Sequence, residues 1–142
     1  MRVDEPSRLI PGEAVDLDTG RIRVRRILGL NPGPMTGPGT NSYLIGSTSL
    51  TLIDPGPIDP AQTANFLAAI GDARLERILV THTHGDHSPA AKALAASTGA
   101  QLVGLNAPEA PGQDHSFVSD IACADGDILC CEKGDAAFSL QL

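Results

Sequence analysis

Apolar and polar positions alternate over short stretches of the chain, with the period of two that is typical of β-strands. Residues 21–28 begin with arginine at every second position, as in a strand with one exposed face. Residues 46–49 separate two short apolar runs and suit a hairpin turn. The strands that the pattern predicts are, in chain order, 21–28, 42–45, 50–53, 78–80, 101–105 and a weak one at 128–129.

Two stretches between these strands have the start and stop residues of helices. Asp59 before Pro60 is a typical N-cap followed by a first helical position, and Gly71 suits the end of that helix. Ser88 before Pro89 repeats this start, and an alanine-rich run to residue 98 follows before a glycine. Strands alternating with helices indicate an α/β domain.

The four arginines of the first predicted strand have two interpretations. They form either its solvent-exposed face or a patch for an anionic ligand, and we favour the exposed face. Residues 31–40, which follow it, are so rich in glycine and proline that we expect no regular structure there.

Length and composition limit the classes of protein that fit. With 142 residues and 42% apolar residues, the chain suits one domain with a hydrophobic core. Its net charge of −7 and few aromatic residues argue against a dedicated nucleic-acid-binding module. We expect a single domain over 1–142, with an N-terminal extension or strand at 1–20 and an atypical tail at 130–142. No apolar run approaches the ~18 residues of a membrane span, so we expect no membrane partner.

Cysteine usage predicts a reducing compartment. Cys123, Cys130 and Cys131 are odd in number, and two of them are adjacent, which fits no disulfide framework. Their spacing is not that of a cysteine zinc site. Because residues 1–10 also lack the apolar stretch of a secretory signal, we expect a cytoplasmic protein.

Three of the four histidines lie within six residues, directly after the predicted strand 78–80. His82 and His84 flank one residue, so extended backbone points both side chains to one side, and Asp86 and His87 follow. Imidazole nitrogen and carboxylate oxygen are ligands that zinc accepts, and α/β folds place ligands at the carboxyl ends of strands. The alternative is a polar turn, but turns favour Gly, Asn or Asp over histidine. The pattern predicts a metal site, whereas we interpret His115 as an exposed loop residue.

The spacing His82-x-His84-x-Asp86-His87 resembles the metal motif of the metallo-β-lactamase-fold hydrolases. Residues 31–45 are similar to the LACTB2-type (endoribonuclease-like) branch, and residues 52–56 resemble an Asp-x-Gly segment of the family. The resemblance covers about residues 20–130. It implies an α/β fold, the N-terminal half of a metallo-β-lactamase αβ/βα sandwich.

This resemblance also implies roles for individual residues. His82 and His84 would hold a first zinc ion, and Asp86 and His87 a second, although other divalent metals are possible. Asp86 would also be catalytic by orienting the nucleophile. Asp54 would orient the motif histidines without binding the metal itself. The enzyme would be a metallo-hydrolase that directs zinc-activated water at an ester, thioester, lactam or phosphodiester bond. The oxygen-reducing di-iron branch usually has Glu where His84 stands, which favours the hydrolases.

The chain departs from the family pattern after the first motif. Family members have a third histidine, a bridging aspartate and a final histidine further on, whereas only His115 follows here. We therefore expect a truncated chain, either a fragment or the product of a shifted reading frame, with little or no turnover on its own. The alternative is a non-catalytic remnant that binds metal weakly or needs a partner chain. The uncovered half would favour self-association, and the substrate, a small molecule or RNA, stays open.

Overall fold

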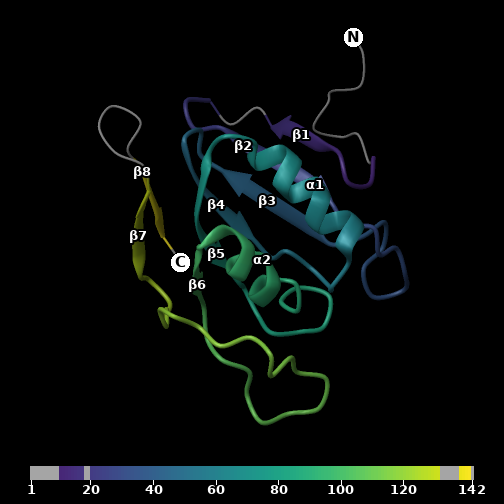
Figure 1. The fold of residues 1–142 in the computed structure, drawn as a ribbon. Helices are drawn as coiled ribbons and strands as arrows, with labels where there is room; N and C mark the ends of the chain where they lie inside the picture. Colours follow the sequence, from purple (N-terminus) through teal and green to yellow (C-terminus); the bar gives the residue numbers. More distant parts are fainter. Residues whose placement is uncertain (1–9, 18–19, 132–137, 142) are drawn as a thin grey trace.

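The computed structural model describes residues 10–17, 20–131 and 138–141. They form a six-stranded sheet with two helices, and a separate two-stranded hairpin (Figure 1). The elements, in chain order, are β1 (Ala14–Leu17), β2 (Val24–Leu28), β3 (Asn41–Ile45), β4 (Ser49–Ile53), α1 (Pro60–Ile70), β5 (Arg74–Leu79), α2 (Ala91–Thr98), β6 (Gln101–Val103), β7 (Ile128–Cys131) and β8 (Phe138–Gln141).

The sheet is mixed, and its parallel part carries the residues of interest. Its strand order is β1-β2-β3-β4-β5-β6, which is also the order along the chain. The pairs from β1 to β4 are antiparallel, whereas β4, β5 and β6 are parallel and are joined through α1 and α2. The carboxyl ends of three neighbouring strands therefore meet at one edge, where α/β folds bind ligands.

Both helices lie against one face of the sheet (Figure 1). The core between them is apolar and includes Leu44, Leu52, Phe66, Ile78 and Leu94. These side chains are at most 1% exposed, so this layer excludes water and fixes the strand ends in place. The mixed α/β architecture agrees with the sequence prediction.

Helix α1 has the boundaries that its sequence predicts. The Asp59 side chain accepts a hydrogen bond from the backbone N–H of Ala61 at 3.0 Å, and Pro60 is the first helical residue. Gly71 ends the helix at a φ of 57°, a conformation that favours glycine. The predicted hairpin between β3 and β4 is also present, since these strands pair antiparallel.

The second predicted helix start is wrong. Helix α2 begins at Ala91, its cap is Ala90, and no side chain caps it. Ser88 donates its hydroxyl to Asp114 at 2.5 Å instead, so a distant carboxylate replaces the expected local cap. The following strand also ends earlier than predicted, at Val103.

The interpretation of the arginines as an exposed face fails at Arg25. This side chain lies on the helix side of the sheet and is only 7% exposed. Its Nη1 donates to the carbonyl oxygen of Ala69 in the last turn of α1, at 2.7 Å. A cation near the C-terminal end of a helix complements the helix dipole. Burial, followed by the charge of Arg23, lowers the pKa of Arg25.

The opposite face of the sheet carries the hairpin of β7 and β8. Arg77 on β5 donates from Nη1 to Sγ of Cys131 at 3.0 Å, and Thr51 Oγ1 lies 4.0 Å from the same sulfur. The tail predicted for 130–142 thus includes strand residues, whereas 132–137 and 142 lie outside the described residues, as do 1–9 and 18–19 of the predicted N-terminal extension. Among the described residues, no helix is long and apolar enough to cross a membrane.

The irregular segment 31–40 is held by its own side chains and by glycine. Asn31 accepts from the Thr40 N–H at 3.0 Å and donates to its hydroxyl at 2.9 Å. Gly39 has a φ of 142°, and a Cβ added to it would lie 2.6 Å from the carbonyl oxygen of Gly29. The segment is therefore closely packed although it lacks regular structure.

We expect Gly39→Ala to lower the free energy of unfolding by about 1–3 kcal/mol, the usual cost of overpacking. The added methyl group would push against backbone, which cannot move aside as a flexible side chain can. Urea unfolding followed by circular dichroism measures the change. Gly33→Ala is the matched control, because its new Cβ would have its nearest neighbour at 3.6 Å. Equal stabilities for the two variants would contradict this account.

Candidate metal centre

The candidate site lies at the carboxyl ends of β4 and β5. Asp54 directly follows the last residue of β4. The motif from His82 to His87 begins three residues after Leu79, the last residue of β5. Parallel pairing of the two strands brings these segments together, and the Asp54 N–H donates to the carbonyl of Leu79 at 2.9 Å. Asp54 has a φ of 51°, which turns the chain sharply at this point.

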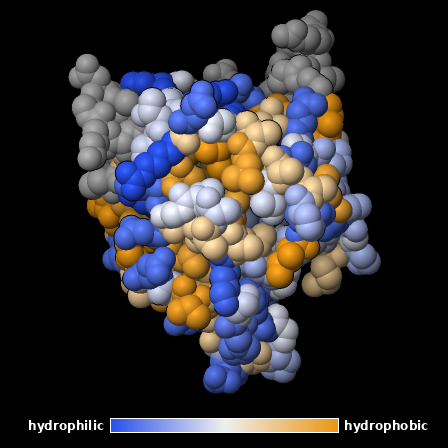
Figure 2. Space-filling view, viewed as in Figure 1, coloured by the Kyte–Doolittle hydropathy of each residue, from blue (hydrophilic) through white to orange (hydrophobic). Residues whose placement is uncertain are grey.

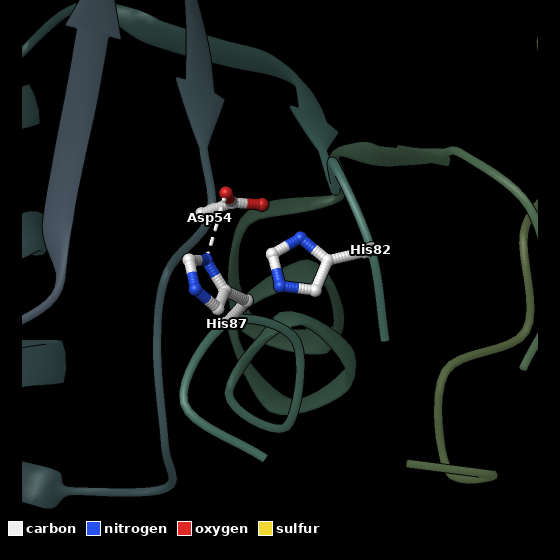
Figure 3. A group of neighbouring side chains, drawn as sticks. All are labelled: Asp54, His82 and His87. Carbon is white, nitrogen blue, oxygen red and sulfur yellow. Dashed lines mark hydrogen bonds and ion pairs between the residues drawn. The ribbon is translucent and has the colours of Figure 1, made fainter. Parts of the chain in front are cut away.

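Asp54 is buried, and three donors share its carboxylate. Oδ1 accepts from the Thr81 N–H at 2.8 Å, and Oδ2 accepts from the Thr81 hydroxyl at 2.5 Å. Nδ1 of His87 lies 3.0 Å from the same Oδ2 (Figure 3). Since a carboxylate only accepts, His87 donates from Nδ1 in this contact, and Nε2 would be its ligand atom toward a bound metal.

Thr81 extends this arrangement to His82. Its single hydroxyl proton is donated to Asp54, so the oxygen acts as an acceptor toward His82 Nδ1, 3.0 Å away. His82 therefore carries its proton on Nδ1 and presents Nε2 as a ligand atom. Hydrogen bonds donated to one buried carboxylate thus orient two histidines, His87 directly and His82 through Thr81.

The histidine rings lie close together. The centroids of His82 and His84 are 4.7 Å apart, and those of His82 and His87 are 4.1 Å apart. Burial, followed by repulsion from His87 and His84, lowers the pKa of His82, which favours the neutral ring that metal binding requires. Asp86 joins the cluster with its Oδ2 3.3 Å from His87 Nε2.

Two sets of three potential ligands share His82. One combines it with Asp54 and His87, the other with His84 and Asp86, and in each set the ligand atoms lie within 4.8 Å of one another. Within the described part of the chain, neither ring nitrogen of His84 has a hydrogen-bond partner. Nitrogen and carboxylate donors that converge in this way fit zinc. The structure thus brings together the five residues that the sequence singled out.

The sequence match extends over the same elements. The family profile described as the Metallo-beta-lactamase superfamily matches residues 35–124, which include β3 to β6 and the histidine motif. The chain belongs to this superfamily. The expected fold and family are therefore confirmed.

Curated relatives and solved superfamily structures match parts of their length. A beta-lactamase-like protein 2 homolog of Drosophila melanogaster is 45% identical over 78 residues, which are 50% of this chain and 26% of that protein. An atrochrysone carboxyl ACP thioesterase of Passalora fulva is 40% identical over 79 residues, 54% of this chain and 24% of that protein. The chain thus spans about a quarter of these relatives. A solved metallo-beta-lactamase of Cronobacter sakazakii, mutated in its HARLDQ motif, shares the fold with a TM-score of 0.58 at 21% identity, over 75% of this chain and 46% of that one.

Asp54 and the histidine motif are also held by Ser42 on β3 and by Thr40, which directly precedes β3. The Thr40 hydroxyl donates to the carbonyl oxygen of Asp86 at 2.6 Å, and Ser42 Oγ donates to that of Asp54 at 2.6 Å. Sequence reasoning missed these contacts, and it missed Thr81 although that residue directly precedes the motif. His115 is exposed and belongs to neither set of potential ligands among the described residues.

A cavity of about 320 Å³ opens beside the superfamily motif. Its lining includes Asp54, Asp86 and His87 from the candidate site, together with Met35 and Tyr43. The candidate ligands are therefore accessible from this cavity.

Asp114 contacts Ser88, the residue that directly follows the motif, and its pKa predicts how the stability of the chain changes in acid. Burial raises its pKa, but hydrogen bonds from Ser116 and Ser88 outweigh that effect and lower the pKa below the ordinary value of 3.8. The carboxylate therefore stabilises the folded chain above pH 3.8, and this contribution disappears as pH falls through the lowered pKa. We expect Asp114→Asn to be less stable than the unmodified chain at pH 7, and the difference to shrink as pH falls below 3.8. Urea unfolding over this range checks the prediction, and a constant difference would contradict it.

Proposed function

We propose that the chain carries the metal-binding core of a zinc-dependent hydrolase, held together by His82, His84, Asp86 and His87. The observation that carries the proposal is the convergence of these side chains in two three-residue sets that share His82, in a member of the Metallo-beta-lactamase superfamily. Asp54, which completes one of the sets, accepts hydrogen bonds from Thr81 and His87 and is given an orienting role in the proposal. We assign His82 and His84 to a first ion, and Asp86 and His87 to a second, as part of this proposal.

Each side chain of the site has a separate role in this proposal. Bound zinc supplies a Lewis acid that activates water near neutral pH and offsets the charge that develops on the scissile group. Asp54 keeps a proton on His87 Nδ1, and Thr81 keeps one on His82 Nδ1, so that both rings offer Nε2. Asp86 accepts a hydrogen bond from the attacking water and orients it, which makes it the catalytic carboxylate.

The proposed reaction is hydrolysis of an ester, thioester, lactam or phosphodiester bond, in a small molecule or RNA. Several relatives are named atrochrysone carboxyl ACP thioesterases and others lactamase-like proteins, which supports testing acyl bonds first. The cavity of about 320 Å³ beside Asp86 offers room for the group next to the scissile bond. The free thiols of Cys123 and Cys131 support the proposal of a reducing, cytoplasmic location.

Hydrolysis assays with zinc and with manganese test this function. The substrates are a thioester, a β-lactam, an activated ester and single-stranded RNA, offered to the 142-residue chain and to an extended version with a further histidine-containing segment. We expect chelator-sensitive turnover by the extended version, lost in Asp86→Asn and retained in His115→Ala. Absence of turnover on every substrate by an extended, zinc-loaded protein favours the non-catalytic alternative. Robust turnover by the 142-residue chain overturns the expectation that it is inactive alone.

We also propose self-association through exposed apolar residues of the connection after β6 and of the start of β7. Leu105, Val118 and Ile128 are each at least 61% exposed, and Figure 2 shows hydrophobic patches interrupting the hydrophilic surface. We expect the chain to bind a hydrophobic dye and to sediment as more than a monomer, and a triple serine variant at these positions to do so less. Ile58→Ser is the control, because Ile58 is 72% exposed elsewhere. A monomer with a sharp transition at high temperature contradicts the proposal.

A further inference from the structure

The long connection between β6 and β7 touches the metal motif at two consecutive residues, Gln113 and Asp114. The Asp114 N–H donates to the carbonyl oxygen of Thr83 at 2.7 Å. The Thr83 hydroxyl donates to Oε1 of Gln113 at 2.7 Å, and Gln113 forms an isolated β-bridge with His84. Thr83 is 3% exposed and stands between His82 and His84, so this contact fixes the backbone that carries both rings.

The Asp114 side chain reaches the other end of the motif. Its Oδ2 accepts from the hydroxyl of Ser88 at 2.5 Å, and Ser88 directly follows His87. Its Oδ1 accepts from the N–H and the hydroxyl of Ser116, which orients the carboxylate from its own loop. Ser88 is 1% exposed, so its hydroxyl has no access to water as a replacement partner.

Asp114 thus hydrogen-bonds to the motif at two points. Its backbone binds between the first two candidate ligands, and its side chain binds directly after the last. Between these points the chain turns through Gly85, where an added Cβ would meet nothing within 4 Å, so packing there does little to fix the turn. Without the Asp114 contacts, the segment from His84 to His87 would keep its turn hydrogen bonds and its contacts to Thr40 and Asp54, but it would lose its anchor at Ser88. The added freedom would have to be lost again when metal binds, and that entropy cost would reduce affinity.

We propose that Asp114 is a positioning residue for zinc: it binds no metal itself but holds the two pairs of candidate ligands at a fixed separation. This inference rests on the proposed zinc binding and adds to it a residue that is distant in sequence. Losing a group that hydrogen-bonds a metal ligand directly usually costs about 10–100-fold in affinity. Asp114 acts on the ligands through Thr83 and Ser88, so we expect a loss at the lower end of this range, about 10-fold, when Asp114 is replaced by alanine.

If Asp114 only stabilised the fold, its replacement would affect zinc affinity no more than the replacement of another aspartate that anchors the same connection, and Asp120 is that aspartate. It lies in the same connection, accepts from the Leu102 N–H at 2.8 Å through Oδ2 and donates its own N–H to the Leu102 carbonyl at 2.8 Å. Asp120 therefore attaches the connection to β6, whereas Asp114 attaches the same connection to the motif. Replacing either aspartate should destabilise the fold, but only the replacement of Asp114 should weaken zinc binding.

The experiment measures zinc affinity by competition with a chromophoric chelator, under conditions where urea titration gives each variant as more than about 99% folded. The variants are Asp114→Ala, Asp114→Asn, Ser88→Ala, the Ser88/Asp114 double alanine variant and the control Asp120→Ala. We expect an affinity about 10-fold weaker for Asp114→Ala, a smaller loss for Asp114→Asn, and affinity within twofold of the unmodified chain for Asp120→Ala. The double variant should bind zinc about as Asp114→Ala does, since both residues form one contact.

Hydrogen exchange on the metal-free variants gives a second measurement. We expect faster exchange of the amides of His87 and Ser88 in Asp114→Ala, but not in Asp120→Ala, because both amides donate to the His84 carbonyl within the held turn. Zinc affinity that is unchanged in Asp114→Ala, or equally weakened in Asp120→Ala, overturns the inference alone. An unmodified chain that takes up no zinc overturns the proposed function and this inference together.

Discussion

A chain with both His82 and His84 replaced by alanine is expected to lose zinc binding by a factor larger than about 100. Losing an outer partner of a ligand usually costs about 10–100-fold, and losing two ligands removes metal bonds themselves. Each set of three potential ligands includes His82, so the double replacement leaves neither complete. Elemental analysis of the purified protein and calorimetric titration with zinc measure the change.

The control for this experiment is His115→Ala. His115 is exposed and lies outside both ligand sets among the described residues, so its loss should leave zinc binding unchanged. Equal zinc retention in the double variant and the unmodified chain would rule out the motif as the metal site. Zinc lost from His115→Ala would mean that this histidine contributes a ligand.

Replacement of Asp54 by alanine is expected to have the largest effect on stability, lowering the free energy of unfolding by about 3–5 kcal/mol. A hydrogen bond to a charged group contributes about 1.5–3 kcal/mol, and the buried Asp54 carboxylate accepts from the Thr81 N–H, the Thr81 hydroxyl and His87. Thr81 is exposed and His87 half-buried, so water replaces part of what these donors lose. The φ of 51° adds strain for alanine. Urea unfolding of the metal-free chain measures the loss, so that metal binding does not contribute to it.

Asp54→Asn separates the two causes. Asparagine tolerates a positive φ and has the same shape, but its amide group has one acceptor atom where aspartate has two. We expect a loss smaller than that of alanine and a zinc affinity still reduced, because the His87 tautomer is no longer fixed. Asn and Ala variants of equal stability would mean that backbone strain contributes little. Unchanged zinc affinity in both would remove Asp54 from the proposed site.

Local sequence rules predicted the features whose partners are close in the chain. The Asp59 cap binds the N–H two residues later, and Gly71 ends the same helix, so α1 follows from its own residues. The metal motif was found in the same way, because its ligand types occur within six residues. Two short-range patterns therefore gave both the strand–helix alternation and the position of the candidate site.

The features that were missed depend on partners far along the chain. Ser88 suits a helix cap, but Asp114, 26 residues away, competes successfully for its hydroxyl. Arg25 has the alternation of an exposed strand residue, yet the end of α1 covers it, 44 residues away in the sequence. Nothing local distinguishes Thr81 from any other threonine until Asp54, 27 residues earlier, is placed beside it.

The same sequence separations affect when the site forms during folding. The bond between Thr81 and Asp54 closes a loop of 27 residues that contains all of α1, and the bond from Thr40 to Asp86 closes one of 46. Such closures cost chain entropy and follow the local hairpin of β3 and β4. The ligand cluster therefore assembles only after β4 and β5 have paired. Zinc added to unfolded chain would find the histidines without their fixed tautomers, and would bind with full affinity only in the last stage of folding.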